Sequence, residues 1–227
     1  MCFSATASFC ASAILTVAGV AALRRVETKS QIPFASIPVI FAFQQFIEGF
    51  VWLSLTHPEY NHLQNIPVTI FLLIAQPVWA FWVPFSFFLI VEKYSKTEKV
   101  MKVLLGFSSV VSIFLAYRIF FYPVGASITP LHIHYELYYP HALLSTIVAV
   151  FYFIATIVPP FLVGLKRMTT LGLLNLMSFI ITFVFFENYV ISIWCFFAAL
   201  ISWEVFLAMK DLNLKQSFTA IPIHSKK

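Results

Sequence analysis

The sequence predicts an all-α integral membrane protein, a bundle of about seven transmembrane helices with its N-terminus outside and its C-terminus in the cytoplasm. The chain of 227 residues is 61% hydrophobic and 10% charged, whereas soluble domains are about 45–50% apolar and about 25% charged. Its apolar residues form runs of about 20, the length that crosses a bilayer as a helix. Its positive charges fall in alternate loops between these runs, and that alternation requires an odd number of spans.

The predicted spans leave no room for a separate soluble domain. They cover residues 4–23, 32–55, 66–91, 103–121, 142–163, 170–186 and 189–209. The third span contains Pro77 and Pro84 and should be kinked, because proline removes a backbone hydrogen bond and crowds the preceding turn. We therefore predict one transmembrane domain over residues 1–210 and a cytoplasmic C-terminal tail over residues 211–227.

Lysine and arginine residues set the predicted orientation. All of them except Arg118 lie in four segments that an odd number of spans places on one side of the membrane. These are Arg24, Arg25, Lys29, Lys93, Lys96, Lys99, Lys102, Lys166, Arg167, Lys210, Lys215, Lys226 and Lys227. Short cytoplasmic loops carry such an excess, so this side is predicted to be cytoplasmic. The net charge of +5 follows from topology and predicts no nucleic-acid partner.

The first apolar run is predicted to be a retained helix that packs closely on another helix. Its nearest positive charges, Arg24 and Arg25, follow the apolar core, whereas a cleaved signal peptide carries them in front. Small residues recur on it every four positions, and these are Ser4, Ser8, Ser12, Ala7 and Ala11. Such a face lets a second backbone approach, either within the bundle, in a homo-oligomer or in a membrane protein partner.

Polar residues in the outer half of the predicted bundle form a candidate ligand pocket around Glu48. An ionisable side chain inside a bilayer is costly and is a functional hypothesis by default. Gln44 and Trp52 lie four residues on either side of Glu48 and share its helix face. The other candidate pocket residues are Gln45, Gln76, Arg118 and Glu187. The alternative is a structural network, with a Glu48–Arg118 ion pair, that holds the helices together.

A second group of residues is a weaker candidate for a metal site. His132, His134 and Glu136 alternate along the chain and would share one side of an extended segment. His141 follows, and Cys2 is predicted on the same side of the membrane. Imidazole and thiolate suit zinc or copper, which would make the protein a membrane-embedded enzyme. The alternative is a set of interfacial histidines, and the sequence identifies no other cofactor.

Several seven-helix classes are disfavoured by the positions of lysine and histidine. A retinal protein needs a lysine in the middle of its last helix, but the predicted last span has none before Lys210. Seven-helix zinc hydrolases place histidines within their helices, and no predicted span contains one. Hydrolase, nucleotide-binding and dinucleotide-binding motifs are also missing from the sequence.

The chain resembles a family of small bacterial multi-span proteins that begin with Met1-Cys2-Phe3-Ser4-Ala5-Thr6-Ala7-Ser8-Phe9. The resemblance continues through Gln44-Gln45 with Glu48-Gly49 and Trp52, and through Ser192-Ile193-Trp194-Cys195-Phe196. It covers most of the chain. The family is a domain of unknown function, so the resemblance implies a bacterial inner membrane protein and supplies no activity.

Three functions are compatible with these patterns. The favoured one is small-solute or proton-linked transport or sensing through an outward-facing pocket around Glu48. The second is a metal-dependent enzyme that uses the outer histidines and Cys2. The third is an accessory subunit of a membrane complex, which would dock through the small-residue face of the first span.

The predicted topology is tested by a reporter fused after Lys227. A reporter that works only in the cytoplasm, such as a fluorescent protein, is expected to be active there, because the last span ends on the positive side. A periplasmic phosphatase at the same position is expected to be inactive. The reverse pattern of activities would contradict both the orientation and the odd number of spans.

Overall fold

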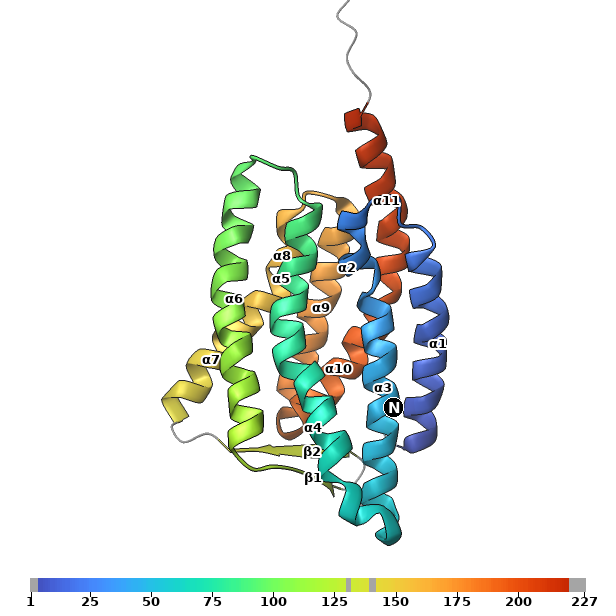
Figure 1. Ribbon diagram of the computed structural model, residues 1–227, viewed down its shortest axis with the longest axis vertical. Helices are drawn as coiled ribbons and strands as arrows, with labels where there is room; N and C mark the ends of the chain where they lie inside the picture. The colour runs from blue at the N-terminus through green and yellow to red at the C-terminus, as the bar shows by residue number, and fades with distance from the viewer. Residues whose placement is uncertain (1–3, 130–131, 139–141, 221–227) are drawn as a thin grey trace, which may run out of the picture.

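The computed structural model describes residues 4–220 apart from 130–131 and 139–141. It shows a bundle of roughly parallel and antiparallel helices that is closed at one end by a β-hairpin (Figure 1). The N-terminal end of α1 lies at the hairpin end, whereas the last helix projects from the opposite end. These two ends are called the hairpin end and the tail end below.

The first four apolar segments form long helices. Their elements are α1 (Ala5–Leu23), η1 (Lys29–Gln31), α2 (Ile32–Ala35), α3 (Ile37–Thr56), η2 (Pro58–Leu63), α4 (Asn65–Leu73), η3 (Ile74–Val78), α5 (Trp79–Ile90) and α6 (Lys96–Phe121). The predicted break at Pro77 is present as η3, a single π-helical turn between α4 and α5. Proline cannot donate to the helical ladder, and such turns are one way a helix accommodates the loss.

The second half of the chain is more broken. Its elements are β1 (Val124–Thr129), β2 (His132–Leu137), α7 (Ala142–Ile157), α8 (Pro159–Leu162), α9 (Lys166–Phe185), η4 (Glu187–Tyr189), α10 (Val190–Ile201) and α11 (Trp203–Ala220). The predicted fifth span is interrupted before Pro159. The predicted seventh span is bent by 41° between α10 and α11.

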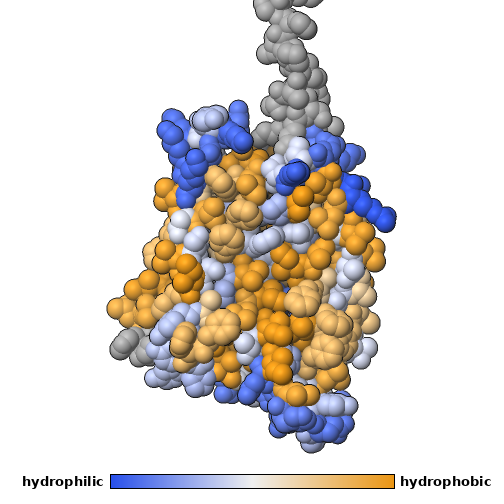
Figure 2. Space-filling view, in the orientation of Figure 1, coloured by the Kyte–Doolittle hydropathy of each residue, from blue (hydrophilic) through white to orange (hydrophobic). Residues whose placement is uncertain are grey.

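Among the described residues, five helices are long and apolar enough to cross a membrane, or six if α10 and α11 form one span. α7 is apolar but shorter, and the break at Pro159 explains why it falls below that length. The surface has an apolar belt between two hydrophilic ends (Figure 2). Soluble proteins rarely expose such a continuous apolar area, so these features suggest a protein embedded in a membrane.

Among the described residues the fold is helical, as predicted, with a two-stranded β-hairpin added to it. β1 and β2 pair antiparallel, with Val124 opposite Leu137 and Thr129 opposite His132. Ile133 and Tyr135 are buried, while His132, His134 and Glu136, which alternate with them, are more exposed. The Tyr135 ring stacks on Phe71 of α4 at 4.6 Å between centroids. The sequence predicts the extended segment at residues 132–136. It does not predict the partner strand β1, because β1 has no strong alternation of polar and apolar residues.

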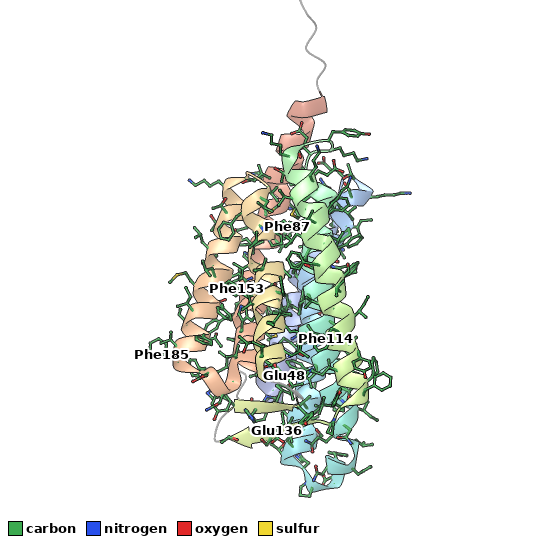
Figure 3. The ribbon with its side chains drawn as sticks, turned by 90° about the vertical axis from the view of Figure 1, so that its left-hand side faces the viewer. Glu48, Phe87, Phe114, Glu136, Phe153 and Phe185 are labelled. Atoms are coloured by element: carbon green, nitrogen blue, oxygen red, sulfur yellow. The ribbon has the colours of Figure 1, made fainter. Side chains whose placement is uncertain are left out.

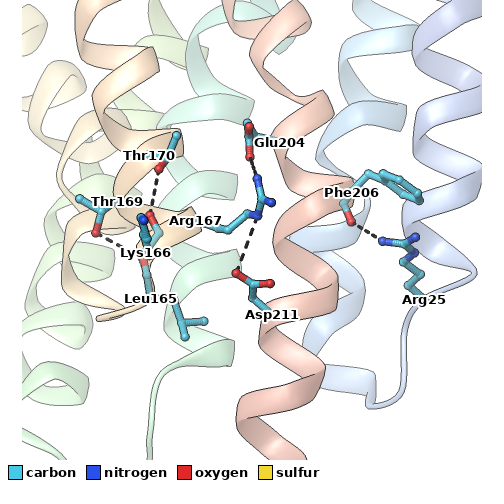
Figure 4. Close-up of polar contacts among 9 residues, drawn as sticks. All are labelled: Arg25, Leu165, Lys166, Arg167, Thr169, Thr170, Glu204, Phe206 and Asp211. Atoms are coloured by element: carbon cyan, nitrogen blue, oxygen red, sulfur yellow. Dashed lines mark hydrogen bonds and ion pairs between the residues drawn. The ribbon is translucent and has the colours of Figure 1, made fainter.

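The predicted boundary at residue 210 falls inside a continuous helix, because α11 runs to Ala220. Side chains beyond the boundary are part of the packed structure. Asn213 accepts a 2.8 Å hydrogen bond from Gln31 and donates a 2.8 Å bond to the Arg25 carbonyl. Arg167 pairs with Glu204 at 3.4 Å and lies 3.8 Å from Asp211 (Figure 4). The first loop and α9 therefore hold α11 at the tail end.

The small-residue face of α1 packs inside the chain. Ser8 and Ser12 are buried, and α1 contacts α3 closely, with Phe9 against Gly49 and Val39 against Gly19. The opposite face of α1 exposes apolar side chains, such as Val17, to the surroundings. The expected close approach of a second helix is therefore made by α3, and the accessory-subunit hypothesis loses the observation that motivated it.

The contact between α1 and α3 yields a test of the fold. A Cβ added at Gly19 would lie 2.9 Å from the Val39 backbone nitrogen, so Gly19→Ala must push the two helices apart. Overpacking of this kind costs about 1–3 kcal/mol. We expect a lower thermal unfolding temperature in detergent.

Gly106→Ala is the matched control for Gly19→Ala. It lies inside α6, and an added Cβ there would meet nothing within 4 Å, so stability should stay the same or rise because alanine favours helix. Equal unfolding temperatures for the two variants would contradict the close packing of α1 on α3.

Candidate functional site

α3 carries a set of buried polar side chains toward the interior of the bundle. Glu48 is completely buried, and Gln44, Gln45 and Trp52 are no more than 4% exposed. Spacings of three and four residues place these side chains on one side of the helix. The predicted pocket residues on this span are therefore brought together, in the half of the bundle near the hairpin (Figure 3).

Glu48 connects α3 to a helix that is distant in the sequence. Gln45 Nε2 donates to Glu48 Oε2 at 3.0 Å, and Ser192 Oγ of α10 donates to Glu48 Oε1 at 2.8 Å. Beside them, Trp79 Nε1 of α5 donates to Gln44 Oε1 at 2.7 Å. Sequence reasoning missed the roles of Ser192 and Trp79, although Ser192 begins one of the segments on which the family resemblance rests.

Three buried polar atoms of this set on α3 lack hydrogen-bond partners among the residues that the structure describes. They are the donor Nε2 of Gln44, the acceptor Oε1 of Gln45 and the donor Nε1 of Trp52. Buried polar atoms in native proteins nearly always have a partner, and an unpaired one costs about 1–3 kcal/mol. A ligand or an ordered water with both donor and acceptor groups would satisfy them.

Arg118 and Gln76 form a separate pair. Arg118 is 1% exposed, and its Nη2 donates to Gln76 Oε1 at 2.9 Å while its Nη1 donates to the Tyr138 carbonyl at 3.4 Å. The ion pairs found among the described residues do not include Glu48 with Arg118. A hydrophobic cluster containing Trp52, Ala75 and Ile119 adjoins both polar groups.

The π-helical turn places Gln76 and gives its neighbours unusual partners. Tyr152 of α7 donates to the Ala75 carbonyl at 2.6 Å, and Ser112 of α6 donates to the Pro77 carbonyl at 2.7 Å. In an apolar interior, irregular helical backbone leaves carbonyl groups that need such side-chain donors. These two hydroxyl groups therefore satisfy backbone carbonyl groups at the proline break.

A cavity of about 420 Å³ lies between the hairpin and the start of α10. Its wall is formed by Ile133, His134, Tyr135, Glu187, Asn188, Tyr189, Val190, Ile191 and Ser192. Glu187, predicted as a pocket residue, and Ser192 therefore line the same space. Because Ser192 also binds Glu48, the cavity wall is one hydrogen bond away from the buried carboxyl group.

The predicted metal ligands are only partly described. His132, His134 and Glu136 share one side of β2, as expected. Nδ1 of His134 donates to the Asn188 carbonyl at 2.7 Å, and Glu136 accepts from Ser127 at 3.3 Å. Burial lowers the pKa of His132, whose ring packs against Tyr189.

Cys2 and His141 lie outside the described residues. Within the described part of the chain, no three His, Cys, Asp or Glu side chains are grouped so that they could hold a metal ion. The metal site therefore stays a prediction from the sequence.

Comparison with known proteins supplies a family but no activity. No curated protein and no solved structure matches the chain. One family model does, over residues 1–218, and its description is a family of unknown function, DUF6629. This match covers nearly the whole chain and agrees with the resemblance seen in its opening segment. The chain therefore belongs to the DUF6629 family of unknown function.

Proposed function

We propose that this chain is a seven-span protein of the bacterial inner membrane that binds a small polar solute or a proton at Glu48 from the outer side, in transport or sensing. The observation that carries this proposal is a fully buried carboxyl group beside three unpartnered buried atoms of described residues, Gln44 Nε2, Gln45 Oε1 and Trp52 Nε1. The carboxyl group lies one hydrogen bond from an open cavity.

The seven spans follow when broken helices are counted as single crossings. α7 with α8 forms the fifth span, and α10 with α11 forms the seventh. The hairpin end then faces outward, because the basic loops after α1, between α5 and α6 and before α9 lie at the tail end (Figure 1), and basic loops are cytoplasmic. The cavity lined by Glu187 and Ser192 accordingly opens to the outside.

The geometry supports binding of a small group with both donor and acceptor atoms. Trp52 Nε1 can donate to it, Gln45 Oε1 can accept from it, and the Glu48 carboxyl group can do either, depending on its proton. Moving a charge into this interior is expensive. Binding of a cation or proton at the Glu48 carboxylate would offset that cost. Such binding would also change the hydrogen bonds that Gln45 and Ser192 donate to this carboxyl group.

Glu48→Gln tests whether the carboxyl group is functional. It keeps the size of the side chain but removes the ionisable group, so the variant should insert and fold yet fail to restore the phenotype of a strain lacking the gene. Glu59→Gln, which changes an exposed carboxyl group of η2, is the control and should restore it fully. Restoration by Glu48→Gln, with only a lowered unfolding temperature, would make Glu48 a structural residue.

The direction of access is tested by cysteine labelling in whole cells, with the exposed native Cys10 and Cys2 replaced by serine. A membrane-impermeant maleimide should label Glu187→Cys from outside, because Glu187 is exposed at the cavity mouth. Glu204→Cys, at the tail end, should react only after the membrane is opened. Labelling of Glu204→Cys alone in intact cells would reverse the proposed orientation.

A further inference from the structure

A second cavity, of about 240 Å³, enters the bundle from the side between α7 and α9. We call it the lateral cavity. Its wall includes Phe183, which is 55% exposed, and the exposed Ala149. It also includes Val148 and Cys195, which are each 7% exposed. The space therefore leads from the surface of the helix bundle to its interior.

The wall of the lateral cavity is apolar apart from Gln76, whose Oε1 accepts a hydrogen bond from Arg118. Aromatic rings line it in contact with one another, with Phe153 4.7 Å from Phe179 and Phe179 4.9 Å from Trp194 between centroids. Its two ring-borne donors are already used, since Tyr152 binds the Ala75 carbonyl and Trp194 binds Asn175. Cavities of this kind stay dry and bind apolar molecules.

The mouth of the lateral cavity faces the predicted hydrocarbon region. α7 leans away from the bundle toward its N-terminal end (Figure 1), and Phe153 marks its place at mid-height in the side view (Figure 3). Around the mouth the two helices expose apolar side chains, which are Leu143, Ile147, Val150, Phe151, Ile180 and Val184. Bilayer chains therefore surround this opening once the protein is embedded.

The inner end of the lateral cavity continues toward the centre. A smaller cavity of about 80 Å³ shares Tyr152, Trp194 and Cys195 with it. Cys195 in turn lies close enough to Gln44 and Glu48 to interact with both. An apolar molecule in this space would extend from the side of the bundle to the edge of the polar site on α3.

We propose that the lateral cavity holds a hydrocarbon chain of a bilayer phospholipid, which enters between α7 and α9. The surrounding bilayer supplies such chains, and filling an aromatic-lined void restores the dispersion contacts that an empty one forfeits. This inference depends on the proposed membrane location, and it is independent of what binds at Glu48.

The test uses tryptophan fluorescence in vesicles of phosphatidylcholine with brominated chains, because bromine quenches tryptophan on contact. Trp52, Trp82 and Trp203 are replaced by phenylalanine, leaving Trp79 and Trp194 of the smaller cavity, which are 4% and 9% exposed. Such buried rings should be quenched only if a chain reaches them from the lateral cavity. We expect strong quenching in the brominated vesicles.

Ala149→Phe, at the mouth, should remove most of this quenching. Val150→Phe, its neighbour on the lipid-facing side and 51% exposed, should leave it unchanged. Absence of quenching, or an equal effect of the two substitutions, would overturn the proposal.

A second measurement needs no tryptophan replacements. Native mass spectrometry of the wild-type protein, after exhaustive detergent exchange, should show a retained phospholipid that Ala149→Phe loses and Val150→Phe keeps. A wild-type protein that carries no phospholipid would overturn the proposal by this route also.

Discussion

The hydrogen bond from Ser192 to Glu48 is the contact on which the arrangement of the hairpin end depends. It joins Glu48 of α3 to Ser192 of α10, two residues separated by 144 positions in the sequence, and both side chains are completely buried. Breaking such a buried hydrogen bond costs about 1–3 kcal/mol, because a buried polar group loses a partner. α10 is thereby held beside α3, and the cavity beneath the hairpin takes its inner wall from the same serine.

A second constraint comes from the π-helical turn at Pro77. Here the groups that need hydrogen-bond partners belong to the backbone and not to side chains. Because an irregular turn needs extra donors in an apolar environment, α6 and α7 each contribute a hydroxyl group, from Ser112 and Tyr152. These bonds bring α7 against the centre of the bundle at one level while its N-terminal end leans away. The lateral cavity lies beside this contact, since Ala75 and Tyr152 both line its wall.

Hydropathy and periodicity predict much of this architecture, and the rest depends on contacts that are distant in sequence. The spacing of Gln44, Glu48 and Trp52 was enough to place them on one buried face. The sequence did not predict that Ser192 binds the Glu48 carboxyl group or that Gln76 binds the Arg118 side chain. The sequence does not show which residue a short polar side chain in an apolar run will bind, because helix packing determines its partner.

The cavity at the hairpin end and the lateral cavity approach the same part of the bundle. A polar route leads from the hairpin end through Ser192 to Glu48, and an apolar route leads from the side past Trp194 to Cys195. Because Cys195 lies beside Glu48 and Gln44, an occupant of the apolar route borders the polar site without entering it. A change in the distance between α7 and α9 would alter the packing around Trp194 and Cys195. It would therefore also change the environment of Glu48. If Glu48 is the outward-facing binding site proposed above, this arrangement would let an occupant from the bilayer influence it.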